Sequence, residues 1–127
     1  MDINDLTGKV IGAAIEVHKQ LGPGLLESAY EECLSRELEL RQVAHKRQKP
    51  LPIEYKGVKL DCGYRLDVVV EDLVLLELKS CDRIEDIHRA QLLTYLKLSG
   101  LKLGLIINFN VPVLRDGIIR VVNHLDE

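Results

Sequence analysis

Hydrophobic residues recur along this chain with two periods, and each period predicts one kind of secondary structure. Over residues 5–20 and 25–41 the apolar positions lie three or four apart, which predicts two amphipathic helices. Gly22-Pro23-Gly24 lies between them and predicts a turn. A third helix is predicted over residues 82–99, because Asp82 and Glu85 form a capping pattern at its start and Gly100 follows it.

Extended structure is predicted for four further segments, at residues 44–60, 64–79, 103–109 and 118–122. Pro50 and Pro52 interrupt the first segment and indicate an edge position, and Lys56-Gly57 predicts a turn within it, so that it yields one or two strands. The third segment is a continuous apolar run, which predicts a central strand covered on both faces.

This order of elements predicts an α/β (α+β) fold. Two helices precede three strands, a third helix follows them, and two strands end the chain, so a mixed β-sheet flanked by helices is expected. At 127 residues the chain is long enough for one substantial core, and residues 1–127 are expected to form a single domain.

The hairpin over residues 64–79 is the most informative segment, because its pairing follows from its own alternation. A two-residue turn at Glu71-Asp72 would mix polar and apolar residues on each face, whereas a three-residue connection or a bulge gives one wholly apolar face. That face consists of Leu66, Val68, Val70, Val74, Leu76 and Leu78. On the opposite face Asp67 then lies across from Glu77, with Lys79 two residues further on.

Two carboxylates at cross-strand distance repel each other, so the pairing of Asp67 with Glu77 needs a compensating interaction. A divalent cation between them would provide it, with Lys79 contributing on the same face. Oxygen ligands with room for water and a phosphate are typical of a magnesium site. The solvated face of a half-exposed hairpin explains the same residues, and the hairpin alone does not decide between these two interpretations.

Two of the predicted helices carry further side chains that could belong to the same site as Asp67 and Glu77. Glu27 lies in the first turn of the second helix, where the helix dipole favours a carboxylate, and Tyr30 projects from the same face. If that face meets the hairpin, Glu27 becomes a third carboxylate of the site. Gln91 and Tyr95 project together from the third helix at the edge of its buried stripe, where they could orient a lysine, a water or a phosphate.

The order of these residues resembles that of the PD-(D/E)XK nuclease superfamily, and the glycine turn resembles its GxxExxY branch. The matching motifs run from the first helix to the last strand and are Gly24-x-x-Glu27-x-x-Tyr30, Asp67, Glu77-x-Lys79 and Gln91-x-x-x-Tyr95. The resemblance implies a restriction-endonuclease-like core with a phosphodiesterase site that depends on Mg²⁺ or Mn²⁺. Leu66 stands where the nominal motif has proline, a position that supplies no ligand.

Roles follow from this resemblance residue by residue. Asp67, Glu77 and Glu27 would be the metal ligands, and Lys79 the catalytic lysine. The supporting residues would be Gln91, Tyr95 and Tyr30. Hydrolysis needs a more acidic water and neutralisation of developing charge, and a divalent cation supplies both. A neighbouring carboxylate disfavours loss of a lysine proton, so Lys79 is expected to stabilise charge in the transition state.

The implied function is a metal-dependent nuclease, with DNA as the substrate expected from the family. One alternative is a catalytically idle module on the same fold that binds nucleic acid or protein. Another is a subunit of a larger assembly in which the carboxylates hold a structural cation. A homodimer or a partner subunit would be compatible with each of these readings.

Composition limits the size of any nucleic-acid contact. The net charge of −3 is not that of a domain with a large phosphate footprint. The exception is the basic run at residues 45–49, where Lys46, Arg47 and Lys49 are candidate nucleic-acid contacts, although five such residues in isolation are more often a solvated strand face. Contact with nucleic acid is therefore expected to be small, local or shared between subunits.

The remaining features exclude several classes of protein. Cys33, Cys62 and Cys81 are too widely spaced for a zinc knuckle and odd in number, so reduced thiols are expected. No apolar run is long enough to span a bilayer, and the N-terminus lacks the pattern of a secretory signal. A cytoplasmic location without a membrane partner is expected.

Overall fold

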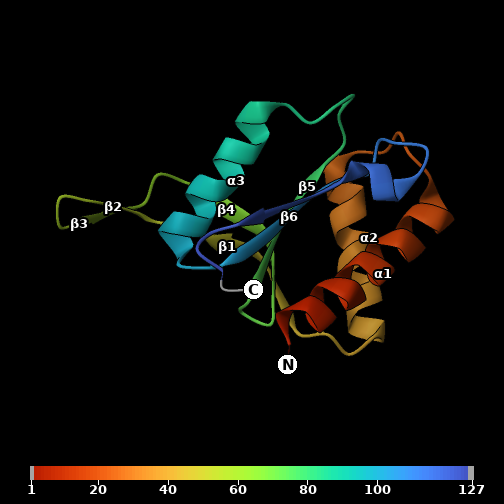
Figure 1. Ribbon diagram of the computed structural model, residues 1–127, viewed down its shortest axis with the longest axis horizontal. Helices are drawn as coiled ribbons and strands as arrows, with labels where there is room; N and C mark the ends of the chain where they lie inside the picture. The colour runs from red at the N-terminus through yellow and green to blue at the C-terminus, as the bar shows by residue number, and fades with distance from the viewer. Residues whose placement is uncertain (1, 126–127) are drawn as a thin grey trace.

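The computed structural model describes residues 2–125, which form a five-stranded sheet with helices on both faces (Figure 1). The helices are α1 (Ile3–Leu21), α2 (Glu27–Leu40), α3 (Asp86–Ser99) and the short 3₁₀ turn η1 (Leu114–Gly117). The strands are β1 (His45–Pro50), β2 (Ile53–Tyr55), β3 (Val58–Leu60), β4 (Arg65–Val70), β5 (Val74–Lys79), β6 (Leu103–Asn108) and β7 (Ile118–Val122).

The sheet is mixed, which confirms the predicted fold class. Its strand order is β1-β4-β5-β6-β7, and β5 pairs with β6 in parallel while the other neighbours are antiparallel. Helices α1 and α2 cover one face and α3 covers the other (Figure 1). Every residue of β6 is buried, as the continuous apolar run predicts for a strand covered on both sides.

Side chains of adjacent strand residues divide the core into two clusters. Val68, Val70, Leu76 and Leu78 pack toward α1 and α2, whereas Val69 and Leu75 pack with Leu92 and Leu96 of α3. Each buried Val or Leu contributes about 1.5–3 kcal/mol relative to an exposed one. Because β4 and β5 carry residues of both clusters, these two strands hold the two helical layers in fixed positions.

The segment 44–60 forms three short strands, so five strands precede α3 instead of the three predicted. Strand β1 lies at the sheet edge as predicted, and Pro50 ends it, since proline has no amide hydrogen to continue the ladder. Strands β2 and β3 leave the sheet and pair with each other. Their connection is the predicted turn, with φ 49° at Lys56 and 83° at Gly57.

Helix α3 begins later than the sequence predicts. Its first residue is Asp86, and the backbone N–H of Glu85 donates to Nδ1 of His88 at 2.9 Å. The prediction that Asp82 caps this helix is wrong, because the chain stays irregular up to Glu85. Gly100 ends the helix as predicted, with φ 77° in the left-handed region.

Strands β4 and β5 pair in the predicted register. The paired residues are Val68 with Leu76, Val69 with Leu75, and Val70 with Val74. Glu71 and Asp72 form the turn, both with φ 54°, and the N–H of Leu73 donates to the carbonyl of Val70 at 2.9 Å. Positive φ at both central residues is the mark of a type I′ turn. Leu73 is therefore the extra residue that keeps polar and apolar side chains on separate faces.

Candidate active site

The alternation of β4 breaks at Asp67. Val68 packs in the cluster beneath α1 and α2, but Leu66 packs in the cluster beneath α3. The prediction that Leu66 and Val68 share a face is therefore wrong. The β4–β5 ladder extends no further than the pair of Val68 and Leu76, so the two strands separate where Asp67 and Glu77 lie.

Carboxylates take the place of ladder hydrogen bonds in this gap. The backbone N–H of Asp67 donates to Oε2 of Glu77 at 3.1 Å. The backbone N–H of Leu78 donates to Oδ2 of Asp67 at 2.8 Å. Each carboxylate is thus held by an amide of the opposite strand, and the structure brings together the two acidic residues that the sequence predicts.

Burial raises the pKa of both carboxyl groups. The pKa of Glu77 rises from 4.5 to about 8, because burial and then the charge of Asp67 disfavour its ionised form. Burial is also the main cause that raises the pKa of Asp67, and the charge of Glu31 adds to it. The positive charge of Lys79 opposes both shifts, which places this lysine beside the pair. Without a cation, the pair retains a proton near neutral pH.

The glycine loop before α2 is fixed by Tyr30. Its ring is fully buried and stacks on Phe109 with the centroids 4.3 Å apart. Its hydroxyl donates to the carbonyl of Gly22 at 2.6 Å and accepts from the N–H of Leu25 at 3.2 Å. Oγ of Ser80 donates to the carbonyl of Leu25 at 2.6 Å. The loop is thereby tied to the residue that follows Lys79.

Glu27 is the first residue of α2 and lies near Asp67. It lines a cavity of about 380 Å³ together with Asp67, Leu78 and side chains of α2 and β1. Among residues 2–125, however, no three His, Cys, Asp or Glu side chains converge closely enough to form a metal cluster. Glu27 thus shares a cavity with Asp67 without completing a three-carboxylate cluster.

Glu31 is a member of the site that the sequence analysis missed. It is buried, and its carboxylate accepts from Nε of Arg47 at 3.0 Å and from Nε2 of Gln48 at 2.6 Å. It lines the same cavity as Glu27 and Asp67. The signal was present in the sequence, because Glu27 and Glu31 are one helical turn apart and project from one face.

The predicted basic contacts have different surroundings. The guanidinium of Arg47 is paired with Glu31 and also lies 2.7 Å from Oε1 of Glu32. Nζ of Lys46 is 3.2 Å from Oδ1 of Asp72 in an exposed pair. Lys49 has no ion-pair or hydrogen-bond partner among the side chains that the structure describes.

Gln91 and Tyr95 form a pair on α3, as their spacing predicts. Nε2 of Gln91 donates to the hydroxyl of Tyr95 at 3.1 Å. Burial raises the pKa of Tyr95, and the charge of Glu77 raises it further, so the phenol lies near the carboxylate pair. The Tyr95 ring also contacts that of Tyr64, with centroids 6.0 Å apart.

This donor set fits a small divalent cation. Mg²⁺ is commonly held by one or two carboxylates, with water and substrate phosphates as its other ligands. Asp67 and Glu77 supply two such carboxylates at a position where the pair otherwise retains a proton. Metal ions compete with protons for such ligands, so a cation would replace that proton.

Comparison with known proteins agrees with this geometry. The family model described as the PD-(D/E)XK nuclease superfamily matches residues 4–121, which include both strand carboxylates and the three helices. The match identifies the superfamily, and the GxxExxY branch stays a prediction from the sequence. No curated protein and no solved structure matches the chain. Within the described range, no helix has the length and hydropathy required to cross a bilayer.

The raised pKa of Glu77 predicts a stability that depends on pH when no divalent cation is present. Its value of about 8 exceeds the ordinary 4.5, so the folded state holds a proton that the unfolded chain has released. The contribution is complete below the ordinary pKa and is lost as the pH rises through the folded value. We expect the free energy of unfolding to fall by on the order of 1 kcal/mol per pH unit between about pH 5 and pH 8.

Denaturant titrations in EDTA across this range measure the slope, with Glu77→Gln as the matched variant. Glutamine stays neutral and still accepts from the Asp67 amide, so it should flatten the pH dependence. An unchanged slope in Glu77→Gln would show that other groups cause it.

Tyr30→Phe tests how the glycine loop is held. Phenylalanine keeps the stacking on Phe109 but removes both hydroxyl hydrogen bonds, which should destabilise the protein by about 1 kcal/mol. Amide hydrogen exchange should accelerate at Leu25, where the bond is lost. Amides of β6 serve as the internal control, and equal acceleration in both places would mean a global effect instead.

Proposed function

Because the chain belongs to the PD-(D/E)XK nuclease superfamily, we propose that it is a nuclease that hydrolyses phosphodiester bonds of DNA with Mg²⁺ or Mn²⁺. The observation that carries the proposal is the pair of buried Glu77 and half-buried Asp67, each held by an amide of the other's strand. We also propose that residues 1–127 act as one nuclease domain.

In this proposal Asp67 and Glu77 hold the cation, and Glu27 completes its surroundings from the N-terminus of α2. When bound, the cation makes a water more acidic and neutralises charge on the phosphate. The carboxylates need little reorganisation to bind it, because backbone amides already fix them. Burial of Glu77 strengthens the electrostatic interactions of the pair.

Lys79 supplies positive charge beside the reacting phosphate. It lies two residues after Glu77 on β5, so both side chains project from the same face of the strand. Its charge already acts on both carboxyl groups. A fixed ammonium group stabilises the negative charge that develops on phosphate oxygens during hydrolysis. Tyr95, held by Gln91, completes this side of the site.

In this proposal, basic residues of the edge strand β1 contact the phosphate backbone of the substrate. Lys49 has no ion-pair partner among residues 2–125, and the exposed pair of Lys46 with Asp72 contributes little stability, so both ammonium groups are available to phosphates. Arg47 would contribute after exchanging its exposed partner Glu32 for a phosphate. The small number of these contacts is compatible with a second copy of the chain sharing the substrate.

Cleavage assays test the proposal directly. With Mn²⁺ or Mg²⁺ we expect the purified chain to cleave DNA, and Asp67→Asn, Glu77→Gln and Lys79→Ala each to lower the rate by about a hundredfold or more. Lys9→Ala, an exposed change on α1, is the control and should leave the rate unchanged. Undiminished cleavage by both carboxylate variants would contradict the assignment.

Metal binding separates a nuclease from an idle scaffold. Mn²⁺ at a hundredfold excess over its Kd should stabilise the wild-type chain by about 2.7 kcal/mol, because it binds only the folded state. Calorimetric titration of the Asp67→Asn variant should show no corresponding heat. If the wild-type chain itself gives neither heat nor stabilisation, the fold serves binding instead of hydrolysis.

A further inference from the structure

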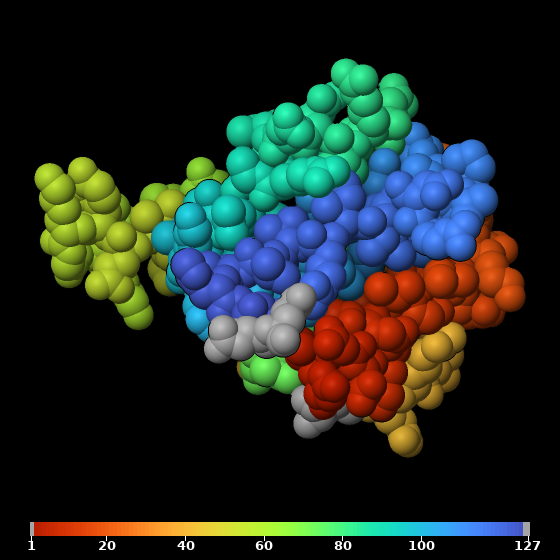
Figure 2. Space-filling model, viewed as in Figure 1, coloured from red at the N-terminus to blue at the C-terminus, as the bar shows by residue number. Residues whose placement is uncertain are grey.

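A hairpin projects from the body of the molecule beside the site. We call residues 51–64, which include β2 and β3, the arm; Figures 1 and 2 show it standing away from the sheet. Of the described residues, none in β2 or β3 belongs to either buried cluster. Tyr55 and Val58 are 61% and 55% exposed. Apart from Leu51 at its base, which is buried in the cluster beneath α3, the arm contributes little to the core, and its surface is available to a partner.

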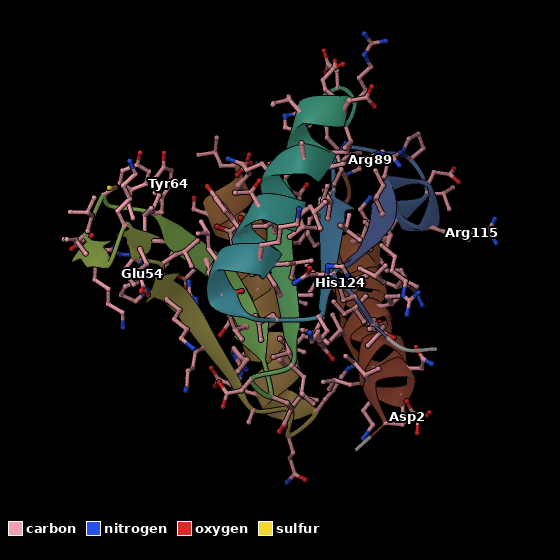
Figure 3. All side chains as sticks on the ribbon, turned by 60° about the vertical axis from the view of Figure 1, so that its left-hand side comes forward. Asp2, Glu54, Tyr64, Arg89, Arg115 and His124 are labelled. Carbon is pink, nitrogen blue, oxygen red and sulfur yellow. The ribbon has the colours of Figure 1, made fainter. Side chains whose placement is uncertain are left out.

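The aromatic residues that are not fully buried, namely exposed Tyr55 and Tyr64 and half-buried Tyr95, lie on this arm and beside it. Three of the four tyrosines are Tyr55 at its tip, Tyr64 at its base and Tyr95 next to Tyr64. Figure 3 shows Tyr64 together with Glu54 on the arm. The other two aromatic residues of the chain, Tyr30 and Phe109, are fully buried. An even scatter of aromatic residues over the surface would not give this arrangement.

The row of tyrosines ends at the carboxylate pair. Tyr64 precedes Asp67 by three residues, and its carbonyl accepts from the N–H of Leu51 at 3.0 Å, which closes the base of the arm. The ring of Tyr95 on α3 contacts that of Tyr64, with the centroids 6.0 Å apart. A ligand lying along the arm would therefore reach the carboxylates.

Positive charge is concentrated in the part of the chain that includes the arm. Residues 45–65 contain six basic and two acidic residues, a net charge of +4, whereas the whole chain carries −3. The remainder therefore carries −7. Within the described part of the chain, Lys49 and Lys59 have no ion-pair partner, and Nζ of Lys56 lies 5.4 Å from the centroid of the Tyr55 ring. Lys46 and Arg47 are paired with acidic residues outside the segment, so a polyanion would approach it chiefly at Lys49, Lys56 and Lys59.

We propose that the arm binds an unpaired strand of the nucleic-acid substrate and leads it to Asp67 and Glu77. Bases stack on Tyr55 and Tyr64, and phosphates lie near Lys56 and Lys59. Stacking on an aromatic ring requires a free base face, which a single strand has and a duplex covers with its neighbouring pairs. Delivery for cleavage rests on the nuclease function proposed above, whereas binding by the arm does not.

Binding is measured in EDTA, so that no cleavage occurs, by the fluorescence anisotropy of a labelled thymidylate strand of about 12 nucleotides. The test variants are Tyr55→Ala and the double variant Lys56→Asn with Lys59→Gln, in which asparagine suits the positive φ of residue 56. The control removes two exposed lysines of α1, with Lys9→Gln and Lys19→Gln.

We expect the single strand to bind at least about fivefold more tightly than a duplex of the same length, and each test variant to weaken it about tenfold. The double variant should also reduce the slope of log K against log salt by about 1.4, or 0.7 for each lost phosphate contact. Tighter binding of the duplex, or equal losses in test and control variants, would overturn the proposal.

A small substrate tests catalysis at the carboxylates independently of binding by the arm. Bis(p-nitrophenyl) phosphate is too short to reach the arm, so the test variants should hydrolyse it with Mn²⁺ at the wild-type rate. On the oligonucleotide their kcat/KM should fall about tenfold. Equal losses on both substrates would overturn a role for the arm in binding. A wild-type chain that binds the strand but hydrolyses neither substrate would refute the nuclease function and leave the arm's role supported.

Discussion

The exchange of ladder hydrogen bonds for carboxylate hydrogen bonds between β4 and β5 is the constraint on which the site depends. Where the strands separate, the amides of Asp67 and Leu78 would be left without partners, and a buried unsatisfied amide costs about 1–3 kcal/mol. The two carboxylates satisfy these amides, but only by entering a region of low polarity. One substitution in the pair therefore disturbs both the sheet and its electrostatics.

Other parts of the fold hold this opening in place from outside. Tyr30 fixes the glycine loop, Ser80 joins that loop to the end of β5, and buried Glu31 forms an ion pair with Arg47 beside Asp67. On α3, Gln91 donates to the hydroxyl of Tyr95, whose ring contacts that of Tyr64. Elements distant in the sequence thus meet at one short stretch of two strands, and rigid supporting elements of this kind preserve the geometry of a site.

The sequence predicts the hairpin register because a one-residue slip would have placed charged residues in the core, so alternation determined the pairing of Val70 with Val74. It does not predict that Leu66 changes face, since the alternation rule assumes a regular pleat and the strand is irregular at Asp67. Glu31 was missed because a charged residue on a helix is usually solvated, and its burial depends on Arg47 from a different element. The arm could not be predicted either, because the residues of β2 and β3 also suit a strand of the main sheet.

The separation of charge between residues 45–65 and the rest of the chain makes the molecule a dipole. In the field of a polyanion such a dipole experiences a torque as well as a force. The torque turns the positive segment toward the polyanion and the negative body away from it. Orientation would then be selected during diffusion, before any atoms touch. Since a Debye length is about 10 Å at 0.1 M salt, the effect should be strongest in dilute buffer and fade as ions are added.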